Sequence, residues 1–467
     1  MQFIGNKIWI ICAQVLLGLL WLCLLVQITT IVSYRHCFTA GELLAWIVAN
    51  SYESGDIIHY CMRYVWPYWL LCTLLFGVGC WWLWTQATKT PKYRYWTITI
   101  LIVLLLPFMV PGQPCCLARE VVCVVKQLRN IRLHRDDATD FVYQAKKVSN
   151  SHSREIYICS IGESLRYANL SLNGMYSRQT TPLLGQQNGL YLYSDCYANA
   201  TLTQHALPML LTGVTGTHFE QHFTRKTIAQ AYRETGFYTI LVSHRAQLMN
   251  NKYHDYLTHD FDSIIWVEHD SLIAPTLRQV MNMHTKLFVI THYLGNHMFY
   301  TNRTEDCLVW RPDYNADPKI KSDSLFLNAY DNSILYTDYL LNKEIEILKQ
   351  SKGIAAWFFI SDHGEYIDHR VSGHGHTYHP AKDEYHVPLM VWYSDEYAAA
   401  YLDKVANMIK HKDEPVCGDH VFWSVLDMAG IEIDSTLQQE GMSIFGDTLL
   451  PYQRTLLLPD GKTIMKL

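Results

Sequence analysis

The sequence predicts an α/β domain with a mostly parallel sheet sandwiched by helices, preceded by N-terminal transmembrane helices. Three observations predict this: long uncharged stretches near the N-terminus, alternating strand-like and helical segments from residue 155 onward, and acidic and histidine residues directly after several of the strand-like runs. A chain of 467 residues is also too long for one ordinary domain. The net charge of −5 and the lack of a basic stripe argue against nucleic acid as a partner.

Three N-terminal stretches have the length and composition of membrane spans: 8–32, 65–85 and 96–117. Each is uncharged and long enough to approach or exceed the ~30 Å hydrocarbon core of a bilayer. The third contains Pro107 and Pro111, which neighbouring helices tolerate within a span. The link between the second and third spans has three basic residues and no acid: Lys89, Lys92 and Arg94. The positive-inside rule therefore puts this link in the cytoplasm and everything after about residue 118 on the other side.

A linker is expected at 118–150, after the transmembrane domain at 1–117. Its residues Val121, Val122 and Val125 recur at helical spacing among basic residues, which predicts an amphipathic helix. This helix either lies in the membrane interface or connects to the next domain while contacting it. The remaining residues, 151–467, form the predicted soluble domain.

Strands and helices alternate along the soluble domain. Apolar runs predict four strands: 155–161, 237–242, 286–291 and 354–360. Helical segments are expected at 226–235, 272–283 and 329–351. Because the strands are apolar on both sides and rich in β-branched and aromatic residues, they indicate a parallel sheet covered on both faces.

Metal-binding residue types follow three of these strands. Glu163 comes after the first, His292 and His297 after the third, and Asp362 and His363 after the fourth. The carboxyl ends of parallel strands share one edge of a sheet, so these side chains are expected to meet. Carboxylate and imidazole together suit Zn²⁺, and the absence of cysteine ligands favours a catalytic over a structural site.

Several short segments occur in a characteristic order. They include Gly162-Glu163-Ser164-Leu165-Arg166, Leu170-Ser171-Leu172-Asn173-Gly174, Thr180-Thr181-Pro182, Gly236-Phe237-Tyr238-Thr239, Tyr330-Asp331-Asn332-Ser333 and Ser361-Asp362-His363-Gly364-Glu365. Together they resemble the phosphoethanolamine transferases of Gram-negative envelopes, which belong to the alkaline phosphatase and sulfatase superfamily. The resemblance implies an alkaline-phosphatase-like periplasmic domain on a multi-pass protein of the bacterial inner membrane.

The resemblance also implies a nucleophilic threonine five positions before a proline. Pro208 places it at Thr203, with Thr201 as the rival. By the same resemblance, the first zinc ion is held by Glu163, Thr203, Asp362 and His363. His297 and His374 hold a second zinc ion or act on the phosphoryl group and its protons, and the number of ions stays open. Because Gly373-His374-Gly375-His376 offers two histidines, His376 is the alternative to His374; Asn199, His292 and His376 are expected to contact substrate.

The implied reaction moves phosphoethanolamine from phosphatidylethanolamine, through a phosphothreonine, to an acceptor such as lipid A, the lipopolysaccharide core or another envelope glycan. Membrane lipids are expected partners, and a monomer is expected. A phosphoglycerol transferase that uses phosphatidylglycerol is the alternative within the superfamily. A sulfatase is not favoured, since no Cys/Ser-x-Pro-x-Arg segment is present. The alternative of another class is a non-catalytic, membrane-anchored binding protein with a decayed site. Such a protein would lack some of the metal-binding residues, yet the sequence has a suitable residue at every expected position.

Cysteines outside the spans allow a disulfide in an oxidising compartment. Four of them lie in the predicted soluble domain: Cys159, Cys196, Cys307 and Cys417. The sequence leaves their pairing open.

Overall fold

The computed structural model divides into two compact units, Met1–Gln127 and Leu128–Leu467. It describes residues 2–467 except 35, 49–54, 56–57, 59–60, 88–90, 111–115, 135, 149–151, 245–254, 299, 305–306, 314–322, 368–372 and 376–377. The domain boundaries expected from the sequence, near 117 and 150, lie on either side of the observed division.

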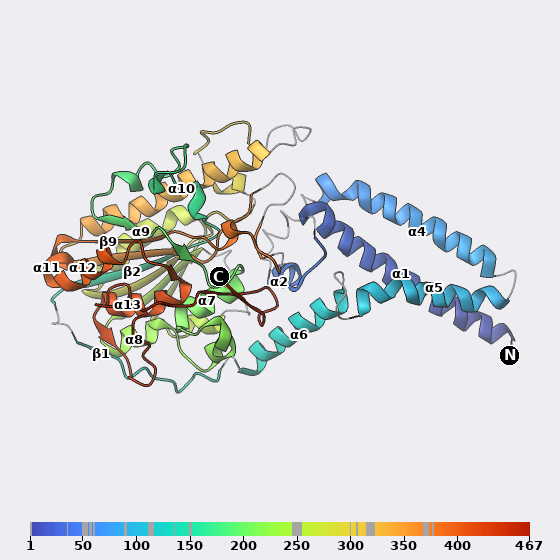
Figure 1. Ribbon diagram of the computed structural model, residues 1–467, viewed down its shortest axis with the longest axis horizontal. Helices are drawn as coiled ribbons and strands as arrows, with labels where there is room; N and C mark the ends of the chain where they lie inside the picture. The colour runs from blue at the N-terminus through green and yellow to red at the C-terminus, as the bar shows by residue number, and fades with distance from the viewer. Residues whose placement is uncertain are drawn as a thin grey trace. The chain divides into compact units, whose positions relative to one another are not determined.

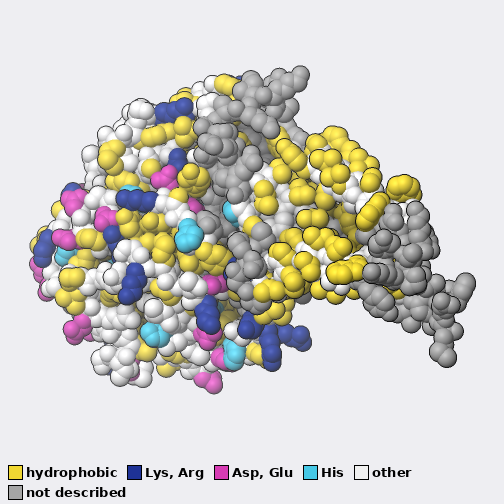
Figure 2. Space-filling view, turned by 45° about the vertical axis from the view of Figure 1, so that its right-hand side comes forward, with side chains coloured by type: hydrophobic (Ala, Val, Ile, Leu, Met, Phe, Trp, Pro, Cys, Tyr) yellow, Lys and Arg dark blue, Asp and Glu magenta, His cyan; other side chains and the backbone are white. Residues whose placement is uncertain are grey.

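The first unit is helical. Its main helices are α1 (Gln2–Tyr34), α2 (Ala40–Val48), α4 (Trp66–Ala87) and α5 (Pro91–Met109), and α1 contacts both α4 and α5 (Figure 1). Within α1, residues Ile11–Val32 form the one helix of the described chain that is long and apolar enough to cross a membrane; Trp96–Met109 is a shorter apolar helix. Apolar side chains dominate the described surface of these helices (Figure 2). Helices thus occur at all three predicted spans, and the spans at α4 and α5 remain predictions.

A helix also occupies the start of the predicted linker. α6 (Leu117–His134) exposes Val121, Val122 and Val125 and carries Arg132 and His134 in its last turn. The expected amphipathic character of this segment is therefore present in a formed helix.

A seven-stranded sheet organises the second unit, in the order β3-β9-β8-β2-β7-β5-β6. The strands are β2 (Glu155–Gly162), β3 (Leu190–Leu192), β5 (Tyr238–His244), β6 (Ser263–Val267), β7 (Lys286–His292), β8 (Ile354–Ser361) and β9 (Leu389–Tyr393). The five from β8 to β6 are parallel, whereas β9 runs antiparallel to β8 and β3 antiparallel to β9. All four predicted strands are confirmed, and they form the centre of this mostly parallel sheet.

Short strand pairs lie outside the main sheet. They are β1 (Lys146–Lys147) with β11 (Ile431–Glu432), β4 (Cys196–Tyr197) with β10 (Val416–Cys417), and β12 (Thr455–Leu457) with β13 (Ile464–Lys466).

Helices cover both faces of the sheet. Figure 1 shows α9 (Ile273–Met283) and α10 (Asp323–Lys349) on one side and α7 (Thr203–Thr212), α8 (Ile228–Glu234) and α13 (Val421–Met428) on the other. Two further helices, α11 (Asp395–Ala400) and α12 (Leu402–Lys410), follow β9. The three predicted helices correspond to α8, α9 and α10, and α10 begins six residues earlier than expected, at Asp323.

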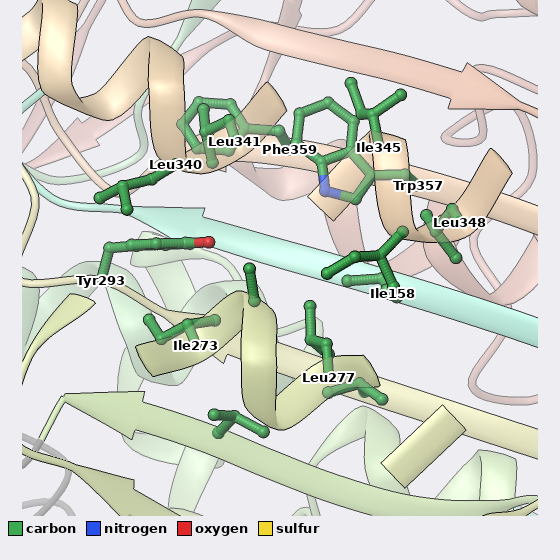
Figure 3. Close-up of a cluster of buried hydrophobic side chains, with 14 of the residues drawn as sticks. Ile158, Ile273, Leu277, Tyr293, Leu340, Leu341, Ile345, Leu348, Trp357 and Phe359 are labelled. Carbon is green, nitrogen blue, oxygen red and sulfur yellow. The ribbon is translucent and has the colours of Figure 1, made fainter. Parts of the chain in front are cut away.

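The central strands are apolar on both sides because each side faces a layer of helices. Every residue of β2 and of β8 is buried. On one face, Ile158, Trp357 and Phe359 form a cluster with residues of α9 and α10 (Figure 3). On the other face, Tyr232 of α8 stacks on Phe288 of β7, with ring centroids 3.7 Å apart. This two-sided burial fixes the strand ends, and with them the site that they carry.

The four cysteines considered for a disulfide are all free thiols. Cys159, Cys196 and Cys417 are buried, and Cys307 is partly exposed. Although Cys196 and Cys417 lie on paired strands, Cys196 is opposite Val416 and Cys417 is opposite Tyr197. The register of β4 and β10 therefore does not place the two thiols opposite each other.

Candidate metal centre and nucleophile

The turn after β2 carries the first acidic residue of the site. Glu163 is 1% exposed. Ser164, which follows it, has a left-handed backbone with φ 58. In this conformation the Ser164 hydroxyl donates to Glu163 Oε1 at 2.8 Å and its amide donates to Asp362 Oδ1 at 3.3 Å. A strained residue thus links the two carboxylates of the site.

The end of β8 brings Asp362 and His363 to the same level as Glu163. Ser361 pairs with Gly162 in the parallel register, and the Asp362 amide donates to the Gly162 carbonyl at 3.0 Å. Gly364 allows the next turn, since a Cβ there would lie 2.0 Å from the Asp383 carbonyl oxygen. The expected meeting of strand ends at one sheet edge is therefore observed for these residues.

Thr203 is the first residue of α7 and is 2% exposed. Its hydroxyl donates to Glu163 Oε2 at 3.0 Å, and its Oγ1 also lies 3.0 Å from His363 Nε2. Thr201, the rival nucleophile, is also buried, but its hydroxyl has no hydrogen-bond partner within the described chain. Of the two threonines, Thr203 is the one that contacts the predicted metal ligands.

The charges around His363 are those of a cation site. Its Nε2 lies 3.2 Å from both Glu163 Oε1 and Asp362 Oδ2, in addition to Thr203 Oγ1. One imidazole N–H cannot donate well to three oxygens at once, whereas a metal ion among them would be coordinated by all four atoms. The donor set therefore fits Zn²⁺.

The pKa values of these groups follow from burial and mutual charge. For His363, burial is outweighed by the two nearby carboxylates, which raise its pKa to about 10. Burial and the charge of Glu163 raise the pKa of Asp362 to about 7. Burial alone would raise the pKa of Glu163, but the charge and hydrogen bond of His363 lower it to about 2. Without a metal ion, the proton of His363 supplies the positive charge of the centre.

A second group of potential ligands shares Glu163. Atoms of Glu163, His297 and His374 lie within 4.8 Å of one another. His297 belongs to the loop after β7, which is tied to Glu163 because the Asn296 amide donates to the Glu163 carbonyl at 3.0 Å. The ring of His374 lies 3.8 Å from that of His363, measured between centroids. The structure thus brings both proposed histidines to the first metal group.

Three histidines of the site are oriented in the same way. The Nδ1 atoms of His297 and His363 lie 2.7 Å and 2.9 Å from the Met298 and Gly364 carbonyl oxygens, and Nδ1 of His374 lies 2.6 Å from Glu365 Oε2. Metal-binding histidines usually donate their second ring N–H to such an acceptor. This pattern leaves Nε2 as the nitrogen suited to coordinate a metal ion, which again fits zinc.

The remaining predicted site residues lie elsewhere or outside the described chain. His292 is the last residue of β7 and is fully buried, with its Nδ1 3.3 Å from Ser243 Oγ, and burial lowers its pKa to about 4. Asn199 donates to Asp419 Oδ1 at 2.9 Å. His376 falls among the residues that the structure does not describe.

Two contributing residues were missed from the sequence. Ser164 joins Glu163 to Asp362, and Glu365 holds His374 while accepting a hydrogen bond from the Tyr300 hydroxyl. Glu365 is buried, which raises its pKa to about 8. Ser164 lies next to Glu163, and Glu365 lies two residues after His363. Their closeness to predicted metal ligands was the one sequence feature that could have indicated a role.

The sheet, its helical layers and the acid–histidine centre at the strand ends define an alkaline-phosphatase-like α/β domain. Residues 155–431, more than half of the chain, match the family model described as Sulfatase. The chain therefore belongs to the sulfatase family.

Several relatives of the chain are named as phosphoethanolamine transferases. The chain is 28% identical over 306 residues to the Kdo(2)-lipid A phosphoethanolamine 7''-transferase of Escherichia coli, covering 61% of this chain and 52% of the relative. It is 29% identical over 296 residues to a phosphoethanolamine transferase of Helicobacter pylori, covering 60% and 54%. The matched part spans about half the length of these relatives. The predicted resemblance to this group is confirmed.

Solved structures share the fold. The integral membrane lipooligosaccharide phosphoethanolamine transferase A of Neisseria meningitidis matches with a TM-score of 0.66 at 18% identity, over 92% of this chain and 86% of that one. The C-terminal periplasmic domain of EcEptC from Escherichia coli, in complex with Zn, matches with a TM-score of 0.59 at 20% identity, over 68% and 93%.

Proposed function

We propose that this protein is a zinc-dependent phosphoethanolamine transferase with Thr203 as its nucleophile. The observation that carries the proposal is the position of Thr203 Oγ1, 3.0 Å from both Glu163 Oε2 and His363 Nε2. The names of the relatives support phosphoethanolamine as the group transferred.

The two groups of closely spaced carboxylate, hydroxyl and imidazole atoms indicate which residues would bind the metal ions. Glu163, Thr203, Asp362 and His363 would hold one zinc ion, and Glu163, His297 and His374 are grouped closely enough to hold a second. Bound zinc would lower the pKa of the threonine hydroxyl and offset negative charge on the phosphoryl oxygens.

The chain's own residues then act in two displacements. The Thr203 hydroxyl gives its proton to Glu163, to which it donates at 3.0 Å, and recovers it when the phosphothreonine is cleaved. The Thr203 oxygen forms a bond to the phosphorus of phosphatidylethanolamine, and the bond from phosphorus to the diacylglycerol oxygen breaks. The diacylglycerol oxygen takes up a proton, which His297 or His374 would supply in the alternative in which these histidines do not hold a second zinc ion. An acceptor hydroxyl or phosphate next attacks the phosphothreonine, loses its proton to one of these histidines, and Thr203 is released with its hydroxyl restored.

The donor and acceptor set the location of the protein. Phosphatidylethanolamine is a membrane lipid, which accounts for an N-terminal transmembrane part at 1–117, a linker at 118–150 and a catalytic domain at 151–467. We place the protein in the bacterial inner membrane as a multi-pass monomer with its catalytic domain in the periplasm. The acceptor is an envelope glycolipid or glycan, with lipid A or lipopolysaccharide favoured by the name of one relative.

The test compares Thr203→Ala with Thr201→Ala in full-length, zinc-loaded protein. Both variants lose the same atoms from buried positions two residues apart. Thr203→Ala is expected to abolish release of diacylglycerol from labelled phosphatidylethanolamine, while Thr201→Ala keeps most of it. Lipid mass spectrometry on cells with and without the protein identifies the acceptor.

The proposal fails if Thr203→Ala still transfers phosphoethanolamine. Consumption of phosphatidylglycerol in place of phosphatidylethanolamine would assign the protein to the phosphoglycerol transferases instead. Absence of transfer from either lipid by the zinc-loaded wild type would favour the non-catalytic binding protein.

A further inference from the structure

A buried carboxylate outside the metal centre holds the loop that carries His297. Asp270 begins a short 3-10 helix, Asp270–Leu272, and is 8% exposed. Its Oδ1 accepts a hydrogen bond from the Leu294 amide at 3.0 Å, and its Oδ2 accepts one from the Gly295 amide at 2.9 Å. Both oxygens of one side chain are therefore committed to two consecutive amides of this loop.

A histidine on the neighbouring strand keeps this carboxylate in place. His244, the last residue of β5, lies 2.9 Å from Asp270 Oδ1 through its Nδ1. Burial acts to raise the pKa of Asp270, but the hydrogen bonds from His244 and from the two amides outweigh it and hold the pKa below its ordinary value. Asp270 is thus an ionised acceptor at neutral pH, and charge strengthens both amide hydrogen bonds.

The loop is fixed at two other points. The Asn296 amide donates to the Glu163 carbonyl at 3.0 Å, and the Asn296 side chain donates to Ser333 Oγ at 2.8 Å. Tyr293, at the start of the loop, lies in the same buried cluster as Ile273, three residues after Asp270 (Figure 3). The segment between β7 and His297 is therefore held by Glu163, by α10 and by Asp270, and within the described part of the chain the two amides at its bend donate to Asp270.

We propose that Asp270 is a positioning residue that sets the location of the His297 imidazole relative to Glu163 and Thr203. This inference rests on the proposed function, in which His297 acts on the transferred group. Asp270 does not itself belong to either metal-binding group. Without its carboxylate, two buried amides lose their acceptor, and the loop shifts to satisfy them elsewhere. A displacement of about 1 Å in a catalytic group costs roughly 100-fold in rate.

The test uses Asp270→Asn in full-length, zinc-loaded protein, because this change keeps size but replaces one acceptor oxygen with a donor. Asp338 offers a matched control: it is 1% exposed, and its two oxygens accept the Leu183 and Leu184 amides at 2.9 Å each. Asp338→Asn therefore replaces one of two buried acceptor oxygens, as Asp270→Asn does, at a turn that carries none of the proposed site residues. The two sites differ in charge, since burial raises the pKa of Asp338 to about 7.

Asp270→Asn is expected to lower kcat by about 10- to 100-fold with the KM for phosphatidylethanolamine unchanged. Asp338→Asn is expected to lower the melting temperature similarly while keeping kcat within a few-fold of the wild type. Equal kcat losses in the two variants, or a loss confined to KM, would overturn the inference.

A double variant separates positioning from general destabilisation. If Asp270 acts through His297, adding Asp270→Asn to His297→Gln causes little further loss, because the two changes affect the same step. A further loss as large as in the wild-type background contradicts the inference. If His297→Gln and Thr203→Ala both keep wild-type rates, the proposed function fails; if only Asp270→Asn behaves like its control, the inference fails alone.

Discussion

Gly295 shows how a single residue keeps two parts of the site in contact. Its backbone is left-handed, with φ +53, and a Cβ added there would lie 3.0 Å from the Glu163 carbonyl oxygen and 3.2 Å from the Glu163 nitrogen. These neighbours are backbone atoms of a buried strand end and cannot move aside easily. A glycine here allows the His297 loop to approach Glu163 closely.

Gly295→Ala is therefore expected to impair transfer far more than stability alone explains. Gly236→Ala is the control, since Gly236 is also left-handed, with φ +85, but has no atom within 4 Å of an added Cβ. Each change should cost about 1–2 kcal/mol of backbone strain. Thermal melts should fall in both variants, and only Gly295→Ala should lose at least about tenfold in kcat. Full activity of Gly295→Ala would contradict the close approach described.

Zinc binding is expected to release protons and to strengthen as pH rises. The pKa of His363 is raised to about 10 and that of Asp362 to about 7, so His363 and part of Asp362 carry protons at neutral pH. The metal requires both groups deprotonated, and each proton that it displaces weakens binding at lower pH. Calorimetry in buffers of different ionisation enthalpy counts these protons. An affinity independent of pH between 6 and 8 would argue against this ligand set.

At the scale of elements, the sequence was most informative where burial is two-sided. The centre of the sheet was predictable because β2, β5, β7 and β8 are apolar on both faces, and Glu163, Asp362 and His363 follow directly from strand ends. The short strands β3, β6 and β9 were missed because three to five residues give too little periodicity.

The site residues that do not follow a strand could not be predicted from hydrophobic periodicity alone. Thr203 begins a helix and His374 lies in the long connection after β8, and only the family resemblance located them. Asp270 and Glu365 act through loop amides and a ring nitrogen, contacts that depend on tertiary structure and leave no periodic trace.

Helix α7 carries a buried histidine, His205, whose burial predicts that the fold is sensitive to acid. Burial lowers the pKa of His205 to about 4, and its ring contacts Phe219 edge-on at 5.4 Å. The unfolded chain therefore binds a proton at His205 between pH 6.5 and 4 that the folded chain excludes. The contribution of His205 to the free energy of unfolding is therefore fully present above pH 6.5, and the free energy of unfolding falls by about 3 kcal/mol as the pH drops to 4.

His205→Asn should lower stability at neutral pH by removing the ring contact, yet flatten the decline with acid. Denaturant melts of wild type and variant at several pH values measure the difference in slope. If the free energy of unfolding of the two proteins falls equally between pH 6.5 and 4, His205 does not cause the loss of stability in acid.

At the scale of the whole molecule, two units of different chemistry share one chain. The first exposes large apolar side chains such as Leu75, Val78 and Trp81, at 64%, 63% and 68% exposure. The second places its large aromatic residues inside, among them Tyr157, Trp357 and Phe422, all at most 1% exposed. Composition alone predicted this contrast, because charge is nearly absent from the N-terminal stretches and common after them.

The buried free cysteines of the second unit have a practical consequence. Burial raises the pKa of Cys159 to about 12, and that of Cys196 and Cys417 above their ordinary range, so the folded protein keeps these sulfurs as unreactive thiols. Maleimide should label them only when the unit opens, at a rate that reports its unfolding. Since none of them forms a bridge, production of this unit requires no oxidising machinery, and its melting temperature should be the same with and without dithiothreitol.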